Sequence, residues 1–305
     1  MIKITSGRKF GYSILLKSLS SLTPKLLQFF HSYTVSSNDA FESKPSSRPT
    51  NSPNLKRIVG IVTDEDMKLH NCKLDHPEKP ERISSIISHL QHSGLLNQCI
   101  YVDKLEEASN EYIELLHPQA YIDYVAALSR DYKESEDSGL RDTYYNKFTN
   151  MAARKALTGA KLITDKIMGG EWDSGYAVIR PPGHHAVVND AIGGFCIFNT
   201  AALTAKFAQK KYNLKRILIF DWDAHHGNST QKNFYDEEIL FISIHRFDEG
   251  YFYPGPSGAI SNLGRGTGLG YNLNLPWNTD YFSVIGDPEC IYIFRKDCLS
   301  NREEF

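Results

Sequence analysis

The stretch Ile217–Asn228, with the sequence ILIFDWDAHHGN, decides how this chain folds. It begins with four consecutive apolar residues, which is the pattern of a parallel strand covered on both faces. Polar residues follow at once, starting with Asp221. In open parallel sheets, ligands bind beyond the carboxyl ends of the strands. The stretch therefore predicts a central strand that ends in a functional site.

Other segments repeat this arrangement. The apolar run Tyr176–Ile179 leads into Arg180-Pro-Pro-Gly-His-His, and Leu240–Ile244 leads into His245-Arg246. Ile58–Val62 is a further β-branched run. Helical patterns separate these strands: Glu81 to Leu96, a helix opened by Pro118, Lys147 to Met168, and a helix capped by Asn199. This alternation predicts an α/β fold with a three-layer, mostly parallel doubly wound sheet.

Length and composition exclude several classes of protein. The 305 residues are 41% hydrophobic and 23% charged, as in ordinary globular proteins. No run of about 18 apolar residues is present, so we expect no membrane-spanning helix. A net charge of −2 argues against a general nucleic-acid-binding protein. The five cysteines are scattered without ligand spacing, which is typical of free thiols in a reducing compartment.

The first 56 residues differ from the rest of the chain. They hold eight Lys or Arg and two Asp or Glu, with many Ser and Thr. This composition is typical of an organelle transit peptide, followed over residues 41–53 by a Ser/Pro/Asn linker. An unselected disordered extension is the alternative. The sequence thus predicts a basic, disordered N-terminal extension (1–56) and one folded domain (57–305).

The residues after the central strand have metal-binding character. Asp221, Asp223 and His225 are spaced two apart, so an extended strand end would turn their side chains the same way. Carboxylate and imidazole together suit Zn²⁺, Fe²⁺ or Mn²⁺. A catalytic zinc needs three protein ligands and an open position, where it lowers the pKa of water to about 7. Asp223 and His225 would supply two of the three.

Paired histidines offer the acid–base chemistry that such a metal needs. His184 and His185 follow Pro181, Pro182 and Gly183 at a strand end. A histidine beside the metal is a common general base, and Asp221 could orient one of the imidazoles. A single histidine is more often structural. Two His-His pairs at consecutive strand ends, beside an Asp-x-Asp, favour the functional interpretation.

Several motifs closely resemble the zinc-dependent histone deacetylase family, class II, nearest its tubulin-deacetylase type. They are RPPGHHA at Arg180–Ala186, GFCIFNTAA at Gly194–Ala202, DWDAHHGN at Asp221–Asn228, HPEKPER at His76–Arg82 and DTYYNKFT at Asp142–Thr149. The resemblance runs from about Arg57 to the chain's end. It implies an arginase/deacetylase-like fold and hydrolysis of N-acetyl-lysine on histones or other proteins, hence chromatin regulation. It further implies one zinc ion, a potassium ion and a co-repressor complex as partner, with no direct contact to nucleic acid or membrane.

The same resemblance implies roles for individual residues. Asp223 and His225 would bind zinc, while His184 and His185 would be the general base and its electrostatic partner, oriented by Asp221 and Asn228. The other implied places are the substrate tunnel with Gly194, Phe195 and Tyr253; an inner cavity with Arg82; and a potassium site with Asp221, Asp223, His225, Ser243 and Ile244, partly through backbone carbonyls.

The sequence departs from the family pattern in three places. The loop from His185 to Phe195 is one residue longer than usual, and Ser229 stands where a glycine is expected. The family's third zinc ligand, an Asp in a stretch like SAGFDA, and its oxyanion Tyr have no counterpart before Phe305. We therefore expect a sheet that is incomplete at its C-terminal end and a chain that is inactive, or nearly so, as a deacetylase.

Other functions stay open at this point. A polyamine deacetylase would use the same site, an arginase-like hydrolase would bind two manganese ions, and a truncated deacetylase could act as a non-catalytic binding protein. The location is also open: the resemblance points to nucleus or cytoplasm, and the basic N-terminal segment to the mitochondrion.

Overall fold

A computed structural model describes residues 2–5, 12–16, 57–133, 142–187 and 193–279, together with residues 286, 288 and 292. The chain divides into two compact units, one of residues 1–18 and 58–279 and one of residues 19–57 and 280–305. The helices and strands named below all belong to the first unit. Its described residues contain no helix that is both long and apolar enough to cross a bilayer.

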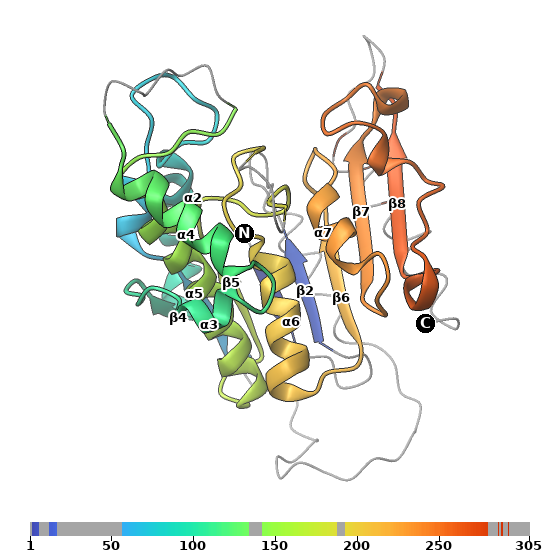
Figure 1. Ribbon diagram of the computed structural model, residues 1–305. Helices are drawn as coiled ribbons and strands as arrows, with labels where there is room; N and C mark the ends of the chain where they lie inside the picture. Colours follow the sequence, from blue (N-terminus) through green and yellow to red (C-terminus); the bar gives the residue numbers. More distant parts are fainter. Residues whose placement is uncertain are drawn as a thin grey trace, which may run out of the picture. The chain divides into compact units, whose positions relative to one another are not determined.

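An eight-stranded sheet forms the centre of this unit, in the order β4-β3-β5-β1-β2-β6-β7-β8 (Figure 1). The strands are β1 (Ile2–Thr5), β2 (Tyr12–Leu16), β3 (Val59–Val62), β4 (Ile100–Val102), β5 (Ser174–Ala177), β6 (Ile217–Asp221), β7 (Leu240–Arg246) and β8 (Asn272–Trp277). Every pairing is parallel except β1 with β2 and β1 with β5. The predicted α/β fold with a mostly parallel sheet is thus confirmed.

Helices connect the parallel strands. They are α2 (Glu81–His92), α3 (Asn110–Ile113), α4 (Gln119–Arg130), α5 (Thr149–Met168), α6 (Thr200–Tyr212) and α7 (Asn228–Phe234). Short 3-10 turns occur at η1 (Glu65–Leu69), η2 (Leu96–Gln98), η4 (Asp248–Gly250), η5 (Pro256–Gly258) and η6 (Gly266–Gly268). Helices α5 and α6 lie side by side in Figure 1. The connection from β3 to β4, which contains α2, runs towards one edge of the sheet, whereas the connections that contain α5 and α6 run towards the other edge. Because such crossovers are right-handed, α2 lies on the face of the sheet opposite to α5 and α6.

Small residues let these helices approach the sheet closely. Helix α5 buries Ala152, Ala156 and Ala160, while α6 buries alanines on its own inner face. On the sheet side, a Cβ at Gly175 in β5 would lie 2.6 Å from the side chain of Ile163 in α5. This close packing forms one hydrophobic core between α5, α6 and the strands.

Most of the predicted elements match the structure to within a few residues. The Asn199 carboxamide oxygen accepts a hydrogen bond from the Ala202 N–H at 3.0 Å, as an N-cap should. The strand predicted over Tyr176–Ile179 begins and ends two residues earlier, as β5. The helix predicted from Glu81 ends at His92, because Gly94 then takes a left-handed conformation with φ 71°.

The N-terminal segment differs from the prediction of disorder where it is described. Strands β1 and β2 lie between β5 and β6, with Ile2 opposite Ala177 and Leu16 opposite Asp221. Their backbones supply hydrogen-bonding partners to two strands that do not pair with each other. The rest of residues 1–56, including the predicted linker, lies outside the described residues, as do the residues after Thr279 apart from three.

Candidate active site

The predicted metal-binding residues lie at the carboxyl end of β6, but the strand does not carry all of them. Strand β6 ends at Asp221, and an extended strand end therefore does not align the three side chains as predicted. Instead, the Asp221 carboxylate accepts a hydrogen bond from the Asp223 N–H at 3.1 Å. The Asp223 carboxylate in turn accepts one from the His225 N–H at 2.9 Å. Two successive Asx-type turns thus bring these residues together.

The two adjacent histidines are oriented by different partners. The His184 Nδ1–H donates to Asp221 Oδ2 at 2.8 Å, and the His185 Nδ1–H donates to Asn228 Oδ1 at 2.7 Å. The ring centroids are 4.0 Å apart. Asn228 begins helix α7, so β6 and α7 each fix one imidazole. The structure therefore brings the four predicted catalytic residues together.

The surroundings shift the pKa values of the two histidines in opposite directions. Burial lowers the pKa of His184, but the charges of Asp221 and Asp223 and the hydrogen bond to Asp221 outweigh it and raise the pKa to about 9. Burial lowers the pKa of His185, and the neighbouring His184 charge lowers it further. His184 is then the imidazolium and His185 the neutral ring. Because the Nδ1–H of His185 points to Asn228, its Nε2 is left as an acceptor.

Ser229, where the family pattern has glycine, fits without backbone strain. Its φ is not positive, and the residue lies in the first turn of α7. Its hydroxyl donates to the backbone carbonyl of His185 at 2.9 Å, and its N–H to the carbonyl of His184 at 3.2 Å. Ser229 therefore binds the backbone of both histidines, through its hydroxyl at His185 and through its N–H at His184. Residues 188–192, in the middle of the longer loop predicted between His185 and Phe195, lie outside the described residues.

The two predicted zinc ligands are adjacent, but they form only part of a zinc site. Asp223 Oδ1 lies 3.3 Å from His225 Nδ1, and both donor types suit zinc. Among the described residues, no three His, Cys, Asp or Glu side chains form a group that could hold a metal ion. Within the part of the chain that the structure describes, the residues therefore fit two positions of a catalytic zinc and do not complete its ligand set.

Two of the predicted tunnel residues, Gly194 and Tyr253, lie against His185, and the third, Phe195, follows Gly194 in the chain. The ring of Tyr253 lies edge-on to that of His185, with centroids 4.9 Å apart, and Tyr253 is 45% exposed. A Cβ on Gly194 would lie 2.3 Å from His185 Cδ2 and 2.8 Å from the Tyr253 hydroxyl, so only glycine fits there. Phe195 follows with φ 69°, a left-handed conformation that costs a non-glycine residue roughly 1–2 kcal/mol.

Arg82 lies on the inner side of the site. It donates through Nη2 to the carbonyl of Ile179 at 2.9 Å and lies 3.6 Å from Glu78 Oε1. Burial lowers the pKa of Arg82, whereas the charges of Glu78 and Asp223 oppose that effect. The inner-cavity role of Arg82 stays a prediction.

Three of the predicted potassium residues lie on neighbouring strands, whereas Asp223 and His225 lie just after β6. Asp221 in β6 is paired in register with Ser243 in β7, and Ile244 follows it. Ser243 and Ile244 are buried, and the Ser243 hydroxyl is 2.8 Å from His245 Nδ1. The backbone and carboxylate oxygens of these strands could contribute to a cation site of the kind that potassium uses.

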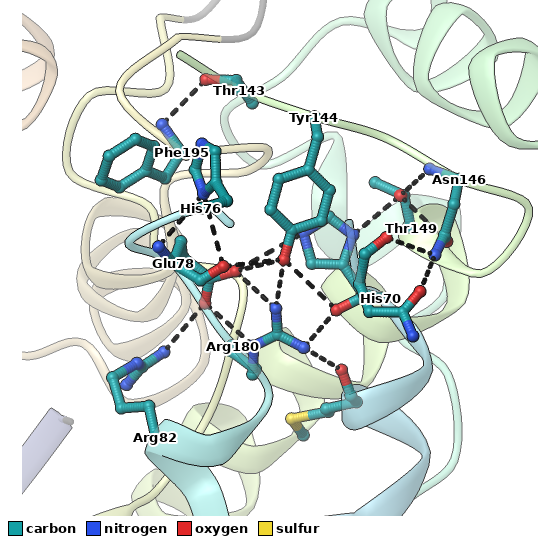
Figure 2. Close-up of polar contacts among 12 residues, drawn as sticks. His70, His76, Glu78, Arg82, Thr143, Tyr144, Asn146, Thr149, Arg180 and Phe195 are labelled. Carbon is teal, nitrogen blue, oxygen red and sulfur yellow. Dashed lines mark hydrogen bonds and ion pairs between the residues drawn. The ribbon is translucent and has the colours of Figure 1, made fainter. Parts of the chain in front are cut away.

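A buried ionic network adjoins the site, and sequence reasoning gave its members no role (Figure 2). Arg180, fully buried, donates through Nε to Glu78 Oε1 at 2.9 Å and through Nη2 to Glu78 Oε2 and the Tyr144 hydroxyl. Its Nη1 donates to the carbonyls of Met67 and His70. Burial raises the pKa of Glu78, but Arg180 and Arg82 outweigh it and hold the pKa at about 2.

The signal for this network was present in the motifs themselves. Glu78 belongs to HPEKPER, Tyr144 to DTYYNKFT and Arg180 to RPPGHHA. Each motif supplies one member, although they are separated by up to 102 residues along the chain. Membership of these motifs marks the three residues as candidates, but no local pattern pairs Glu78 with Arg180 or adds Tyr144 to them.

The fold and the site together define an α/β protein with a mostly parallel sheet, in which two adjacent histidines with different hydrogen-bond partners lie at the carboxyl end of the central strand β6. A model of the histone deacetylase domain matches residues 76–305. The chain belongs to the histone deacetylase family. The predicted resemblance to class II members is confirmed.

Individual relatives agree with this assignment. Human histone deacetylase 9 is 40% identical over 273 residues, covering 81% of this chain and 27% of that protein. Histone deacetylase 5 of Arabidopsis thaliana is 39% identical over 236 residues, covering 74% and 36%. The crystal structure of the HDA15 HD domain superposes with a TM-score of 0.70 at 34% identity, covering 80% of this chain and 68% of that one. The chain thus spans about a third of the length of the curated relatives it matches.

Proposed function

We propose that this chain carries the acid–base pair and the substrate tunnel of a zinc-dependent deacetylase that hydrolyses N-acetyl-lysine on histones or other proteins. The observation that supports this best is that the two adjacent histidines have different acceptors, Asp221 for His184 and Asn228 for His185. His185 has an Nε2 acceptor, and its ring centroid is 6.1 Å from that of His225, the proposed zinc ligand. The proposed general base therefore lies next to a proposed metal ligand.

The proposed division of labour follows from the hydrogen bonds. His185 would take a proton on Nε2 from the attacking water and pass it to the leaving lysine amine, a role that contributes roughly 10²–10⁴-fold to the rate. Asn228 keeps the proton on Nδ1, so the accepting nitrogen stays directed at the substrate. His184, held as an imidazolium by Asp221, would stabilise negative charge that develops on the acetyl group. Zinc, when bound, would make the water more acidic.

The tunnel residues would select the substrate. The Tyr253 ring beside His185 and the Phe195 ring offer apolar faces to a linear alkyl stem, and Gly194 keeps the passage next to His185 open. We therefore propose acyl-lysine as the substrate class, with a potassium ion at Asp221, Ser243 and Ile244 as a structural cation.

The test uses the full chain with Zn²⁺ and an acetyl-lysine peptide, with release of acetate as the measurement. Acetate release that His185→Ala abolishes and His89→Ala leaves unchanged would support the proposal, because His89 is an exposed histidine on α2. An acetylated polyamine in a parallel assay would show whether a free polyamine is the better substrate.

A second candidate is a non-catalytic protein that binds acetyl-lysine. It is favoured by the observation that the described residues contain no group of three His, Cys, Asp or Glu side chains that could hold a metal ion. Binding of the acetyl-lysine peptide without acetate release would support it. Absence of both binding and turnover by a folded chain would contradict both candidates.

A further inference from the structure

Two consecutive backbone amides at the proposed tunnel are held by two consecutive side chains from a distant segment. The Gly194 N–H donates to Asp142 Oδ2 at 3.0 Å, and the Phe195 N–H donates to Thr143 Oγ1 at 2.8 Å. Both bonds join residues that are 52 positions apart. Figure 2 shows the second of them, with Thr143 directed at the Phe195 backbone.

These bonds occur where the backbone needs support. Gly194 and Phe195 both have positive φ, 55° and 69°, and such a conformation is unfavourable for phenylalanine. On its other side, Gly194 is packed against His185 and the Tyr253 hydroxyl. A small rotation of these peptide units would therefore move the Phe195 ring relative to His185.

The segment that provides the two side chains is itself fixed. Thr143 and Tyr144 are buried, and the Tyr144 hydroxyl donates to Glu78 Oε2 at 2.8 Å within the Arg180 network. The ring of His76 lies edge-on to Phe195 with centroids 4.9 Å apart, and its Nε2–H donates to the carbonyl of Asp142 at 3.2 Å. The backbone of Phe195 is thus bound to Thr143 and its ring packs on His76, and both of these residues are connected to the buried Arg180 network through the segment Asp142–Tyr144.

We propose that Asp142 and Thr143 are positioning residues for the acyl-lysine tunnel: by holding the Gly194 and Phe195 amides, they set the distance between the Phe195 ring and His185. This inference rests on the proposed function for its second part, the effect on the ligand. Its first part, the holding of the two amides, does not depend on any ligand.

Hydrogen exchange of the full chain tests the first part. Thr143→Val removes the acceptor while keeping the shape, and Thr143→Ser restores it; Asp142→Ala and Asp142→Asn form the matching pair. We expect Thr143→Val to speed exchange at the Phe195 amide roughly three- to tenfold, the factor that one net hydrogen bond contributes, and Thr143→Ser to leave it near the wild-type rate. Equal exchange in the valine and wild-type proteins would overturn the proposal.

Peptide binding tests the second part. The affinity for an acetyl-lysine peptide should fall roughly three- to tenfold in Thr143→Val and Asp142→Ala and stay near the wild-type value in the serine and asparagine variants. The thermal midpoints of the valine and alanine variants should fall by only about 2–4 °C, so that all four variants are folded in the binding assay. Faster exchange with unchanged affinity would overturn the positioning role. If the wild-type chain binds no acetyl-lysine peptide, the proposed function fails, whereas the exchange result still decides whether the two amides are held.

Discussion

Replacing Glu78 by glutamine should destabilise the protein strongly, although the two side chains are almost the same size. Glu78 is buried and its carboxylate faces Arg180 through two hydrogen bonds. Glutamine keeps one oxygen but places an amide NH₂ opposite a guanidinium nitrogen, donor against donor. Arg180 is 0% exposed and would keep its positive charge without a carboxylate.

The expected magnitude follows from this burial. Breaking a buried ion pair by removing one partner costs about 3–5 kcal/mol, because the other charge is left uncompensated. Arg82, 3.6 Å from the same carboxylate, loses a counter-charge as well, which favours the upper part of that range. We therefore expect a loss of about 4 kcal/mol in the free energy of unfolding, out of a typical total of about 5–15 kcal/mol.

Urea unfolding of the full chain, followed by circular dichroism, measures this loss. Glu81→Gln is the matched control, because Glu81 is an exposed glutamate at the start of α2, three residues along the chain, and should change stability by less than about 0.5 kcal/mol. A loss below about 1 kcal/mol in Glu78→Gln would show that Arg180 finds water or another partner, and would refute the description of the network as a closed, buried ion pair.

Acid should destabilise the fold through His70, because burial lowers the pKa of this histidine from 6.5 to about 3. Its contribution to the free energy of unfolding is complete above about pH 6.5 and is lost as the pH falls towards 3, so unfolding curves of a His70→Gln variant should depend less on pH over that range. Gly194→Ala should cost about 2–4 kcal/mol, since its Cβ would overlap the His185 ring at a positive φ; Gly193→Ala, where nothing lies within 4 Å, should be near neutral in the same thermal assay. Ser229→Ala should lose about 1 kcal/mol, the net value of the bond to the His185 carbonyl, and an unchanged unfolding free energy would contradict that.

Local patterns predicted the elements of the fold well, because a strand or a helix is specified by residues close in sequence. The N-cap role of Asn199 and the strand before Asp221 depend on a few neighbouring residues, and both are found. The alignment of Asp221, Asp223 and His225 was predicted for the wrong reason: the carboxylates compete for backbone N–H groups and turn the chain just after the strand.

Long-range polar partners could not be predicted in the same way. Nothing in the local sequence around Arg180 shows that it meets Glu78, 102 residues earlier, or that Tyr144 joins them. The same holds for Thr143 and the Phe195 amide, since side-chain-to-backbone bonds leave no periodic pattern. The resemblance to a family identified the motifs that carry these residues, and the structure is needed to connect them.

The position of β1 and β2 links protein sorting to folding. If residues 1–56 were a cleaved transit peptide, cleavage would remove both strands that separate β5 from β6. The sheet would then consist of two halves, β4-β3-β5 and β6-β7-β8, with two open backbone edges facing each other. A protein from which residues 1–56 have been cleaved therefore cannot have this eight-stranded sheet. The mass of the intact mature protein shows whether the cleavage has occurred.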